Sequence, residues 1–153
     1  MGISIKICAL IMTMYAFGTT SFYKAFSSDS EAVIKAELKG INPNKSTQNQ
    51  AYFGALTMKC ADFGGGPAQK LQYFRNGKKA LEAAIKKEPL NAEFRLIRLT
   101  IQEKCPRMLN YRKNINEDKQ LIIKGFSQFP ASIRRFVTDY AKSSIALNTA
   151  DLK

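Results

Sequence analysis

From residue 28 onward, apolar residues recur every three or four positions, and polar clusters containing glycine or proline separate the runs. This spacing places the apolar side chains of each run on one face of an α-helix. No run alternates apolar and polar residues with the period of two that a half-buried strand shows. The pattern therefore predicts an all-α protein of about five to six helices.

Capping signals and helix breakers set the predicted limits of each helix. Ser28 and Glu31 stand at capping-box spacing and begin a helix that Gly40 ends, and a turn containing Phe22 and Phe26 is expected before it. The later helices are predicted at residues 46–63, 68–88, 91–105, 114–126 and 132–147.

The segment NAEFRLIRLTIQEKCP, residues 91–106, carries two apolar stripes. At about 100° per residue, Leu96 and Leu99 lie nearly opposite a first stripe, which consists of Leu90, Phe94, Ile97, Ile101 and Cys105. A helix on the surface of a bundle needs only one apolar face, so this helix is predicted to lie between neighbours.

Two interpretations of the polar edge between these stripes are open. In the first, Arg95, Arg98 and Gln102 form the floor of a groove for an anionic or carboxylate-bearing partner, because guanidinium groups bind carboxylates through paired hydrogen bonds. Tyr111 and Arg112 then border the groove. In the second, the arginines serve the fold by pairing with carboxylates of adjacent helices; the candidates are Glu82, Glu117 and Asp118.

Length and charge narrow the function further. A chain of 153 residues is long enough to bury one sizeable core and too short to argue for two domains. Its 24 Lys and Arg residues against 12 Asp and Glu residues leave a formal charge of +12. Such a charge attracts anionic partners, namely nucleic acid, anionic lipid or an acidic polymer.

The first 21 residues are laid out like a secretory signal peptide. Lys6 precedes the apolar run from Ile7 to Phe17, small residues follow, and no acidic residue comes before Asp29. The run is about a dozen residues long, which is shorter than the roughly 20 that a membrane-spanning helix needs. We therefore expect a signal peptide at 1–21, cleaved before Thr19 or just after Ser21, and a single domain at 22–153. A buried first helix of a cytosolic protein is the alternative.

Cys60 and Cys105 remain after such a cleavage. In an oxidising compartment they can form a disulfide if the fold brings their α-carbons within about 7 Å. Both occupy apolar positions of predicted helices, so packing as free thiols in the core is the favoured expectation.

No constellation of catalytic residues is visible. The sequence has no histidine, which removes the usual general base, the usual partner of a nucleophile and the commonest metal ligand. Glu117 and Asp118 are expected to offset the positive end of a helix dipole. The sequence thus favours a non-enzymatic protein with neither cofactor nor metal.

The junction ALEAAIKKEPLNAEF resembles the corner between two tetratricopeptide (TPR) repeats. The resemblance covers residues 77–102 and places Gly77 and Leu81 at the small and large apolar positions of the helix before Pro89. Arg95 and Arg98 depart from the repeat pattern in the next helix. The resemblance implies antiparallel helical hairpins stacked as a short TPR-like array.

The chain is also similar to a family of small exported helical proteins of Bacteroidota. Four motifs carry this resemblance: AYFGALTMKCA, PAQKLQYFRNGKKALEAAIKKEP, NAEFRLIRLTIQEKCP and LNYRKNINEDKQLII. It implies export and a repeat-like fold, and it implies no activity.

Two functions follow as hypotheses. The first is an exported binding or scaffold module, periplasmic or secreted, which uses a basic helical groove to engage a protein or peptide of the cell envelope. The second is electrostatic binding of an acidic polymer or lipid head group. Nucleic acid joins the second group only if the amino terminus is not a signal.

Overall fold

The computed structural model describes residues 18–153, and within that range the chain is helical and contains no strand. The all-α prediction is confirmed, and residues 18–153 contain seven α-helices where five to six were predicted for the protein. A first helix spans residues 18–26. It is followed by α2 (Glu31–Gly40), α3 (Thr47–Lys59), α4 (Pro67–Lys87), α5 (Ala92–Lys104), α6 (Ile115–Gly125) and α7 (Ala131–Ala141). Short 3₁₀ turns η1 (Cys60–Phe63), η2 (Arg107–Leu109), η3 (Phe126–Gln128) and η4 (Thr149–Asp151) lie between or after them.

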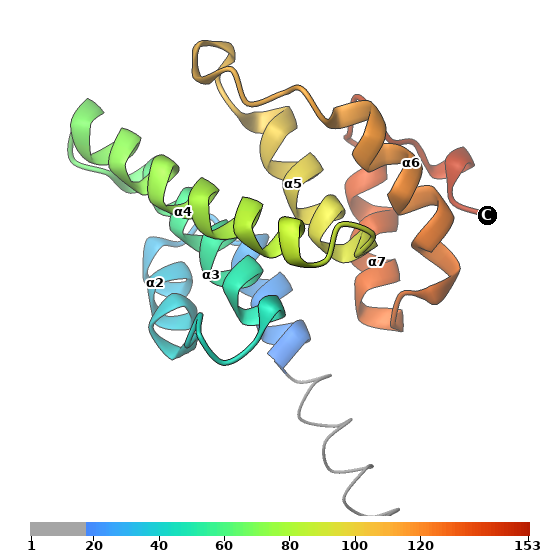
Figure 1. Cartoon of the computed structure of the whole chain (residues 1–153), viewed down its shortest axis with the longest axis horizontal. Coiled ribbons are helices and arrows are strands. Elements are labelled where there is room, and N and C mark those ends of the chain that lie inside the picture. The colour runs from blue at the N-terminus through green and yellow to red at the C-terminus, as the bar shows by residue number, and fades with distance from the viewer. Residues whose placement is uncertain (1–17) are drawn as a thin grey trace, which may run out of the picture.

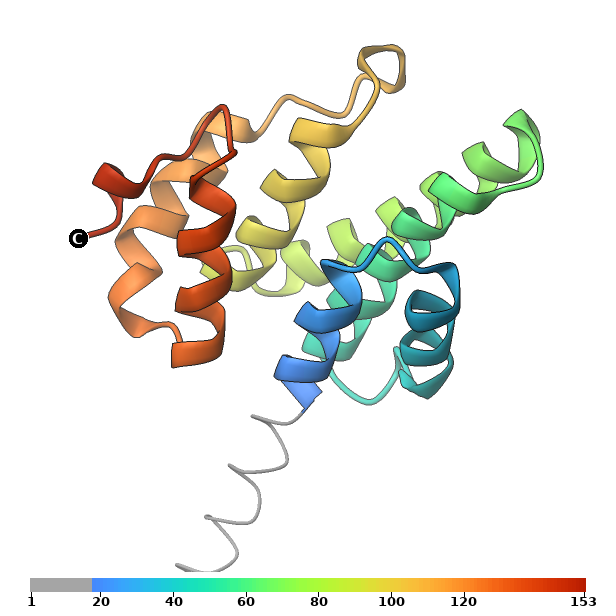
Figure 2. The same cartoon turned by 180° about the vertical axis from the view of Figure 1, so that it is seen from behind.

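The helices form two groups with α5 between them. Helix 18–26, α2, α3 and α4 lie on one side, and α6, α7 and the carboxyl terminus lie on the other (Figures 1 and 2). None of the helices in the described range is both long and apolar enough to cross a membrane. The apolar run from Ile7 to Phe17 lies outside the described residues.

Residues 18–26 form a helix, so the expected turn around Phe22 and Phe26 is wrong. The ring of Phe22 is fully buried and stacks on Tyr52 of α3 at a centroid distance of 3.7 Å. Tyr23, Ala25 and Phe26 are buried as well. Their spacing places most of one helical face against the core, which stabilises the helix more than its local sequence does.

The predicted cap of the next helix is displaced by two residues. Ser30, and not Ser28, accepts a hydrogen bond from the backbone N–H of Val33 and begins α2. Ser28 instead accepts one from the N–H of Ser30. Both serines have the chemistry of a cap, and the tertiary path of the chain selects the second.

Helices α3 and α4 form an antiparallel hairpin with very close backbones. A β-carbon on Gly54 would lie 2.7 Å from the carbonyl oxygen of Gly77, and one on Gly77 would lie 2.6 Å from the backbone nitrogen of Met58. Glycine is the residue type that permits this approach, because any side chain would collide with the opposite backbone.

The prediction that the helix after Pro89 is covered on several faces is confirmed. The side chain of Asn91 caps α5 by accepting hydrogen bonds from the N–H groups of Glu93 and Phe94. Helix α5 contacts α3, α4 and α6. Its buried residues include Phe94 and Ile97 of the first stripe and Leu96 and Leu99 of the second. Arg95, Arg98 and Gln102, between the stripes, are buried too. Leu90, at the start of the first stripe, is 79% exposed.

Helix α7 is shorter than predicted, because it ends at Ala141 and not at Leu147. The carboxylate of Glu103 on α5 accepts hydrogen bonds from the Ser144 hydroxyl (3.0 Å) and from the N–H groups of Ile145 (2.9 Å) and Ala146 (2.7 Å). These bonds hold the chain in a turn. Leu147, which the turn brings back to the core, is fully buried.

Helix α6 begins at Ile115, close to the predicted start, and its N-cap residue is Asn114. The Asn114 side chain accepts no backbone hydrogen bond; its Nδ2 donates to Glu117 Oε2 at 3.2 Å. Asp118 is in the first turn, where the helix dipole favours a carboxylate, but it is completely buried.

Candidate functional site: a lysine-edged apolar groove

Asp118 of α6 lies beneath two guanidinium groups of α5. Arg98 binds it with two hydrogen bonds, Nε to Oδ2 and Nη2 to Oδ1, both 2.7 Å long. Arg95 Nη1 donates to Oδ1 of the same carboxylate and to Glu117 Oε1, at 3.0 Å each. Burial alone would lower the pKa of Arg98, but the hydrogen bond and charge of Asp118 raise it above its usual value. The guanidinium therefore stays charged inside the protein.

Further bonds extend this cluster to α4. Arg98 Nη1 donates to Glu82 Oε2 at 3.0 Å, and the Tyr111 hydroxyl donates to Glu82 Oε1 at 2.5 Å. Burial and the charge of Glu82 raise the pKa of Tyr111, so the phenol remains protonated. Arg95 also donates to the carbonyl of Pro89 at 2.6 Å. The cluster thereby joins α4, α5 and α6.

This geometry matches the second interpretation of the polar edge, in which both arginines pair with acidic residues of adjacent helices. Arg95 is 6% exposed, Arg98 is 3% exposed and Gln102 is fully buried, so the predicted groove floor is not an open surface. Tyr111 is joined to the arginines through Glu82. Arg112 is not part of the cluster, because its Nη2 donates to the Glu103 carbonyl near the end of α5.

Gln102 differs from its neighbours because neither its Oε1 nor its Nε2 has a hydrogen-bond partner among the described residues. A buried amide without partners costs free energy. Within residues 18–153, Gln102 therefore contributes volume to the interface of α5 and no side-chain hydrogen bond, and its burial keeps it from an external ligand.

An open concave surface lies at the carboxyl-terminal end of α5. A cavity of about 580 Å³ is lined by helix 18–26, the end of α3 with η1, the start of α4, and the end of α5 with η2. We call it the lysine-edged groove. Its lining consists of Phe26, Met58, Lys59, Ala61, Asp62, Pro67, Lys70, Leu71, Phe74, Thr100, Ile101, Lys104, Cys105, Pro106, Met108 and Leu109.

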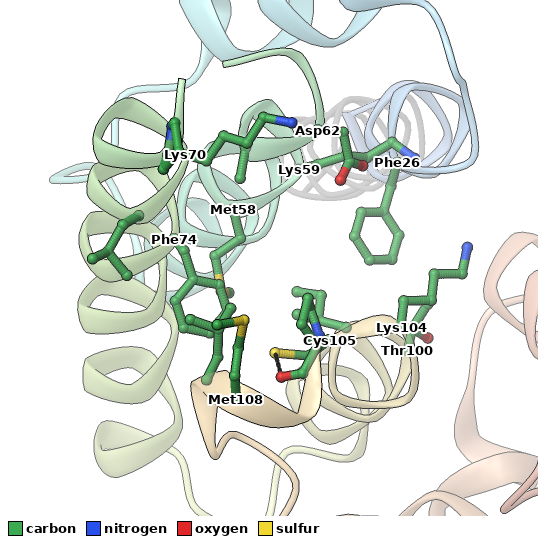
Figure 3. Close-up of a pocket in the computed structure, with 16 residues that line it drawn as sticks. Phe26, Met58, Lys59, Asp62, Lys70, Phe74, Thr100, Lys104, Cys105 and Met108 are labelled. Atoms are coloured by element: carbon green, nitrogen blue, oxygen red, sulfur yellow. Dashed lines mark hydrogen bonds between the residues drawn. The ribbon is translucent and has the colours of Figure 1, made fainter. Parts of the chain in front are cut away.

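Most of this lining is apolar. Phe26, Met58, Phe74, Cys105 and Met108 surround the hollow in Figure 3. The flexible thioether side chains of methionine adapt their shape to an apolar ligand, and aromatic rings supply large apolar surfaces. Met108, in η2, is 89% exposed at the edge of the groove. The surface therefore offers water-accessible apolar contact.

Charged groups on the groove are mainly cationic. Three lysines and one aspartate belong to the lining, and the side chains of Lys59, Lys70 and Lys104 lie at its periphery (Figure 3). The side chain of Lys59 is only 14% exposed, and its contact with the fully exposed Asp29 is 4.0 Å long. Burial and the neighbouring charge of Lys104 lower the pKa of Lys59. The positive charges of Lys59 and Lys104 are thus close enough to repel one another.

Cys60 and Cys105 are both free thiols and both buried, so the possible disulfide is not formed and the favoured packing in the core is what the structure has. Burial raises the pKa of each thiol. A raised pKa leaves little thiolate near neutral pH, which makes these cysteines weak nucleophiles. Among residues 18–153 there is also no group of His, Cys, Asp and Glu side chains placed to hold a metal ion.

A second cavity, of about 700 Å³, lies beside the amino-terminal end of α5 and is lined by Glu93 among others. The Glu93 carboxylate accepts hydrogen bonds from the hydroxyls of Tyr52 (2.5 Å) and Tyr23 (3.3 Å) and from Gln48 (3.4 Å). Burial raises the pKa of Glu93 despite these donors. Its donors come from helix 18–26 and α3, so this carboxylate connects those helices with α5.

Sequence reasoning missed the groove, because it assigned no role to Met108 and Leu109 within residues 106–113, which it left as a linker between two predicted helices. Met108 and Leu109 were the available signal, since a solvated linker has no need of two consecutive large apolar residues. The remaining lining comes from four separate segments, and their meeting cannot be read from any one of them.

Comparisons with models of protein families, with curated proteins and with solved structures found no match to this chain. The fold alone therefore defines the class: over residues 18–153 this is an all-α protein.

Proposed function

We propose that this protein is a non-catalytic binding module that holds a partner through the lysine-edged groove. The observation that carries the proposal is the combination, in one cavity, of an apolar lining with three lysines at its edge. Such a surface favours a partner that is both apolar and acidic, because burial of apolar area supplies affinity and opposite charge supplies orientation. The basic groove of the first hypothesis is thus retained at a new location.

The absence of histidine from the whole sequence supports a non-catalytic role. The polar cluster of Asp118, Arg95 and Arg98 supports it as well. Each of its charged groups already has a partner within the protein, which leaves none positioned to exchange protons with a substrate.

A TPR-like stack is part of the proposal. The antiparallel α3–α4 hairpin and the corner at Pro89 support it, since both are features that such repeats share. A partner would then lie against the ends of several helices, as it does on the concave surface of a helical array.

The setting that we propose is the cell envelope, as a periplasmic or secreted protein, with a protein or peptide as partner. Cleavage before Thr19 fits the packing best. The Thr19 hydroxyl accepts a hydrogen bond from Tyr52 (3.4 Å), and the Ser21 hydroxyl donates one to Glu37 (2.5 Å). Cleavage after Ser21 would remove both contacts.

The proposed setting predicts the mass of the exported protein. Mass spectrometry of protein purified from the native envelope should show a chain that begins at Thr19. A chain that retains Met1 and the apolar run up to Phe17 would contradict export, and one that begins at Phe22 would contradict the choice of cleavage site.

The binding function is testable with 8-anilinonaphthalene-1-sulfonate, an anionic apolar dye. We expect saturable binding to the folded protein, a clear loss in Met108→Asp and no loss in Ile145→Asp. The two positions are matched, because Met108 is 89% exposed in the groove lining and Ile145 is 88% exposed outside it. Equal dye binding by both variants would contradict the proposal.

Electrostatic binding of an acidic polymer, a lipid head group or nucleic acid is the second candidate. The net charge of +12 favours it. Binding through many phosphate contacts weakens steeply between about 50 and 200 mM salt, whereas binding in a single groove responds much less. A steep salt dependence that Met108→Asp leaves unchanged would support this alternative.

A further inference from the structure

The lysine-edged groove also indicates what kind of ligand it holds. Its volume of about 580 Å³ falls within the range of roughly 300 to 1,000 Å³ that is typical of small-molecule sites. Its lining converges on one hollow from four segments of the chain. A partner helix would need an elongated groove with anchor sites one helical turn apart. The volume and the convergent lining therefore favour a small ligand over a helix.

The walls of the hollow suit a hydrocarbon chain. Phe26 is 6% exposed, Met58 is 4% exposed and Phe74 is 8% exposed, so each is held by the core and presents one surface to the cavity. Met108, at the edge of the hollow, is 89% exposed and adds a flexible apolar side chain to it. An unbranched alkyl chain fits such a lining, since its shape adapts as that of methionine does.

The edge of the hollow suits an anion. Burial lowers the pKa of Lys59, and the charge of Lys104, which also lines the groove, lowers it further. Within residues 18–153 the one ion pair of Lys59 is the 4.0 Å contact with exposed Asp29, and water weakens a pair of that kind. A carboxylate or phosphate between the two ammonium groups would replace their repulsion by two attractions. Asp62, the acidic residue of the lining, offsets only part of this charge.

We propose that the groove binds a single-chain anionic amphiphile, with its alkyl chain against Phe26, Met58 and Phe74 and its carboxylate or phosphate head between Lys59 and Lys104. This inference rests on the proposed binding function, and it assigns a small amphiphile to the groove in place of the protein or peptide partner. A fatty acid and an alkyl phosphate share the chemistry that the site recognises, and separate titrations distinguish them.

Isothermal titration calorimetry of the full chain with dodecanoate and with dodecyl phosphate, each below its micelle concentration, tests the inference. We expect saturable binding of one or both anions and at least tenfold weaker binding of dodecyltrimethylammonium, which has the same chain and the opposite charge. Across octanoate, decanoate and dodecanoate, affinity should rise about three- to fourfold per added methylene group. Each bound anion should also raise the melting temperature.

Two lysine variants locate the head group. Lys104→Gln should weaken dodecanoate binding about tenfold, because a charge-assisted hydrogen bond is lost. Lys79→Gln removes the same charge from an exposed position of α4 outside the groove lining, and it should leave binding unchanged. Equal losses in both variants, or equal affinity for the anionic and the cationic amphiphile, would overturn the inference.

The inference and the proposed function can fail separately. If no amphiphile binds, but a short acidic peptide with aromatic residues binds and loses affinity in Met108→Asp, the ligand class is wrong and the binding function stands. If the anionic dye, the amphiphiles and the peptide all fail to bind the folded protein, both are wrong.

Discussion

At the scale of single residues, Asp118 has the most demanding position. It is fully buried and receives hydrogen bonds from Arg95 and Arg98. The choice between a binding groove and an internal ion cluster could not be made from sequence. Helical periodicity showed that the arginines share an edge of α5, but only the packing of α6 against α5 places a carboxylate on that edge.

Asp118→Asn should destabilise the protein strongly. It leaves buried guanidinium groups without full charge compensation, which costs about 3 to 5 kcal/mol. Chemical denaturation measures the loss in free energy of unfolding. Glu117→Gln is the control, because the Glu117 side chain is 55% exposed and an exposed ion pair contributes only about 0 to 1 kcal/mol. Similar small losses in both variants would show that the buried cluster does not stabilise the fold.

Glu93 predicts a pH dependence of stability. Because burial raises its pKa in the folded state, the folded protein binds this proton more tightly than the unfolded chain does. The stabilisation is fully present below the unfolded pKa of about 4.3 and is lost as the pH rises through the folded pKa. The free energy of unfolding of the wild type, relative to Glu93→Gln, should therefore increase as the pH falls from about 7 to 4. A flat or opposite trend would contradict this assignment.

At the scale of helices, local patterns predicted most elements well. Helices α3, α4 and α5 begin and end within a few residues of the predicted limits, because caps such as Ser46 and Asn91 and breakers such as Pro89 act locally. The misses occur where distant contacts decide. Helix 18–26 is stabilised by the ring of Tyr52, and α7 ends where Glu103 binds the following turn.

The α3–α4 hairpin predicts opposite effects for two glycine substitutions. In Gly77→Ala the new β-carbon would lie 2.4 Å from the Gly54 carbonyl oxygen. We expect a loss of about 1 to 3 kcal/mol in free energy of unfolding from overpacking. Gly40→Ala is the matched change, since nothing lies within 4 Å of its added carbon. Gly40→Ala should leave the free energy of unfolding unchanged or raise it by up to about 1 kcal/mol. A Gly77→Ala variant that unfolds with the same free energy as the wild type would refute the close approach of the two helices.

At the scale of the whole molecule, α5 connects the two groups of helices. It carries the bonds to Asp118 on one edge and, through Glu103, the bonds to residues 144–146. The groove at the carboxyl-terminal end of α5 depends on the same arrangement, since its lining includes residues of the amino-terminal helix, α3, α4 and η2. No local property of those segments specifies how they meet.

Glu103→Ala should release the carboxyl-terminal segment. The N–H groups of Ile145 and Ala146 lose their acceptor, so their hydrogen exchange should become fast while that of the α3–α4 hairpin stays slow. Glu103→Gln retains an acceptor oxygen and should preserve part of the protection. Unchanged exchange at Ile145 and Ala146 in Glu103→Ala would contradict the role of this carboxylate.

The sequence by itself determined the helical class and the limits of the central helices. Those properties depend on residues within a few turns of one another, where spacing, caps and breakers act directly. Only the tertiary structure decided that Arg95 and Arg98 are internal, that residues 18–26 are helical and that a lysine-edged hollow lies beside Met108. Each of these depends on contacts between segments far apart in the chain, and periodicity carries no information about which segments meet.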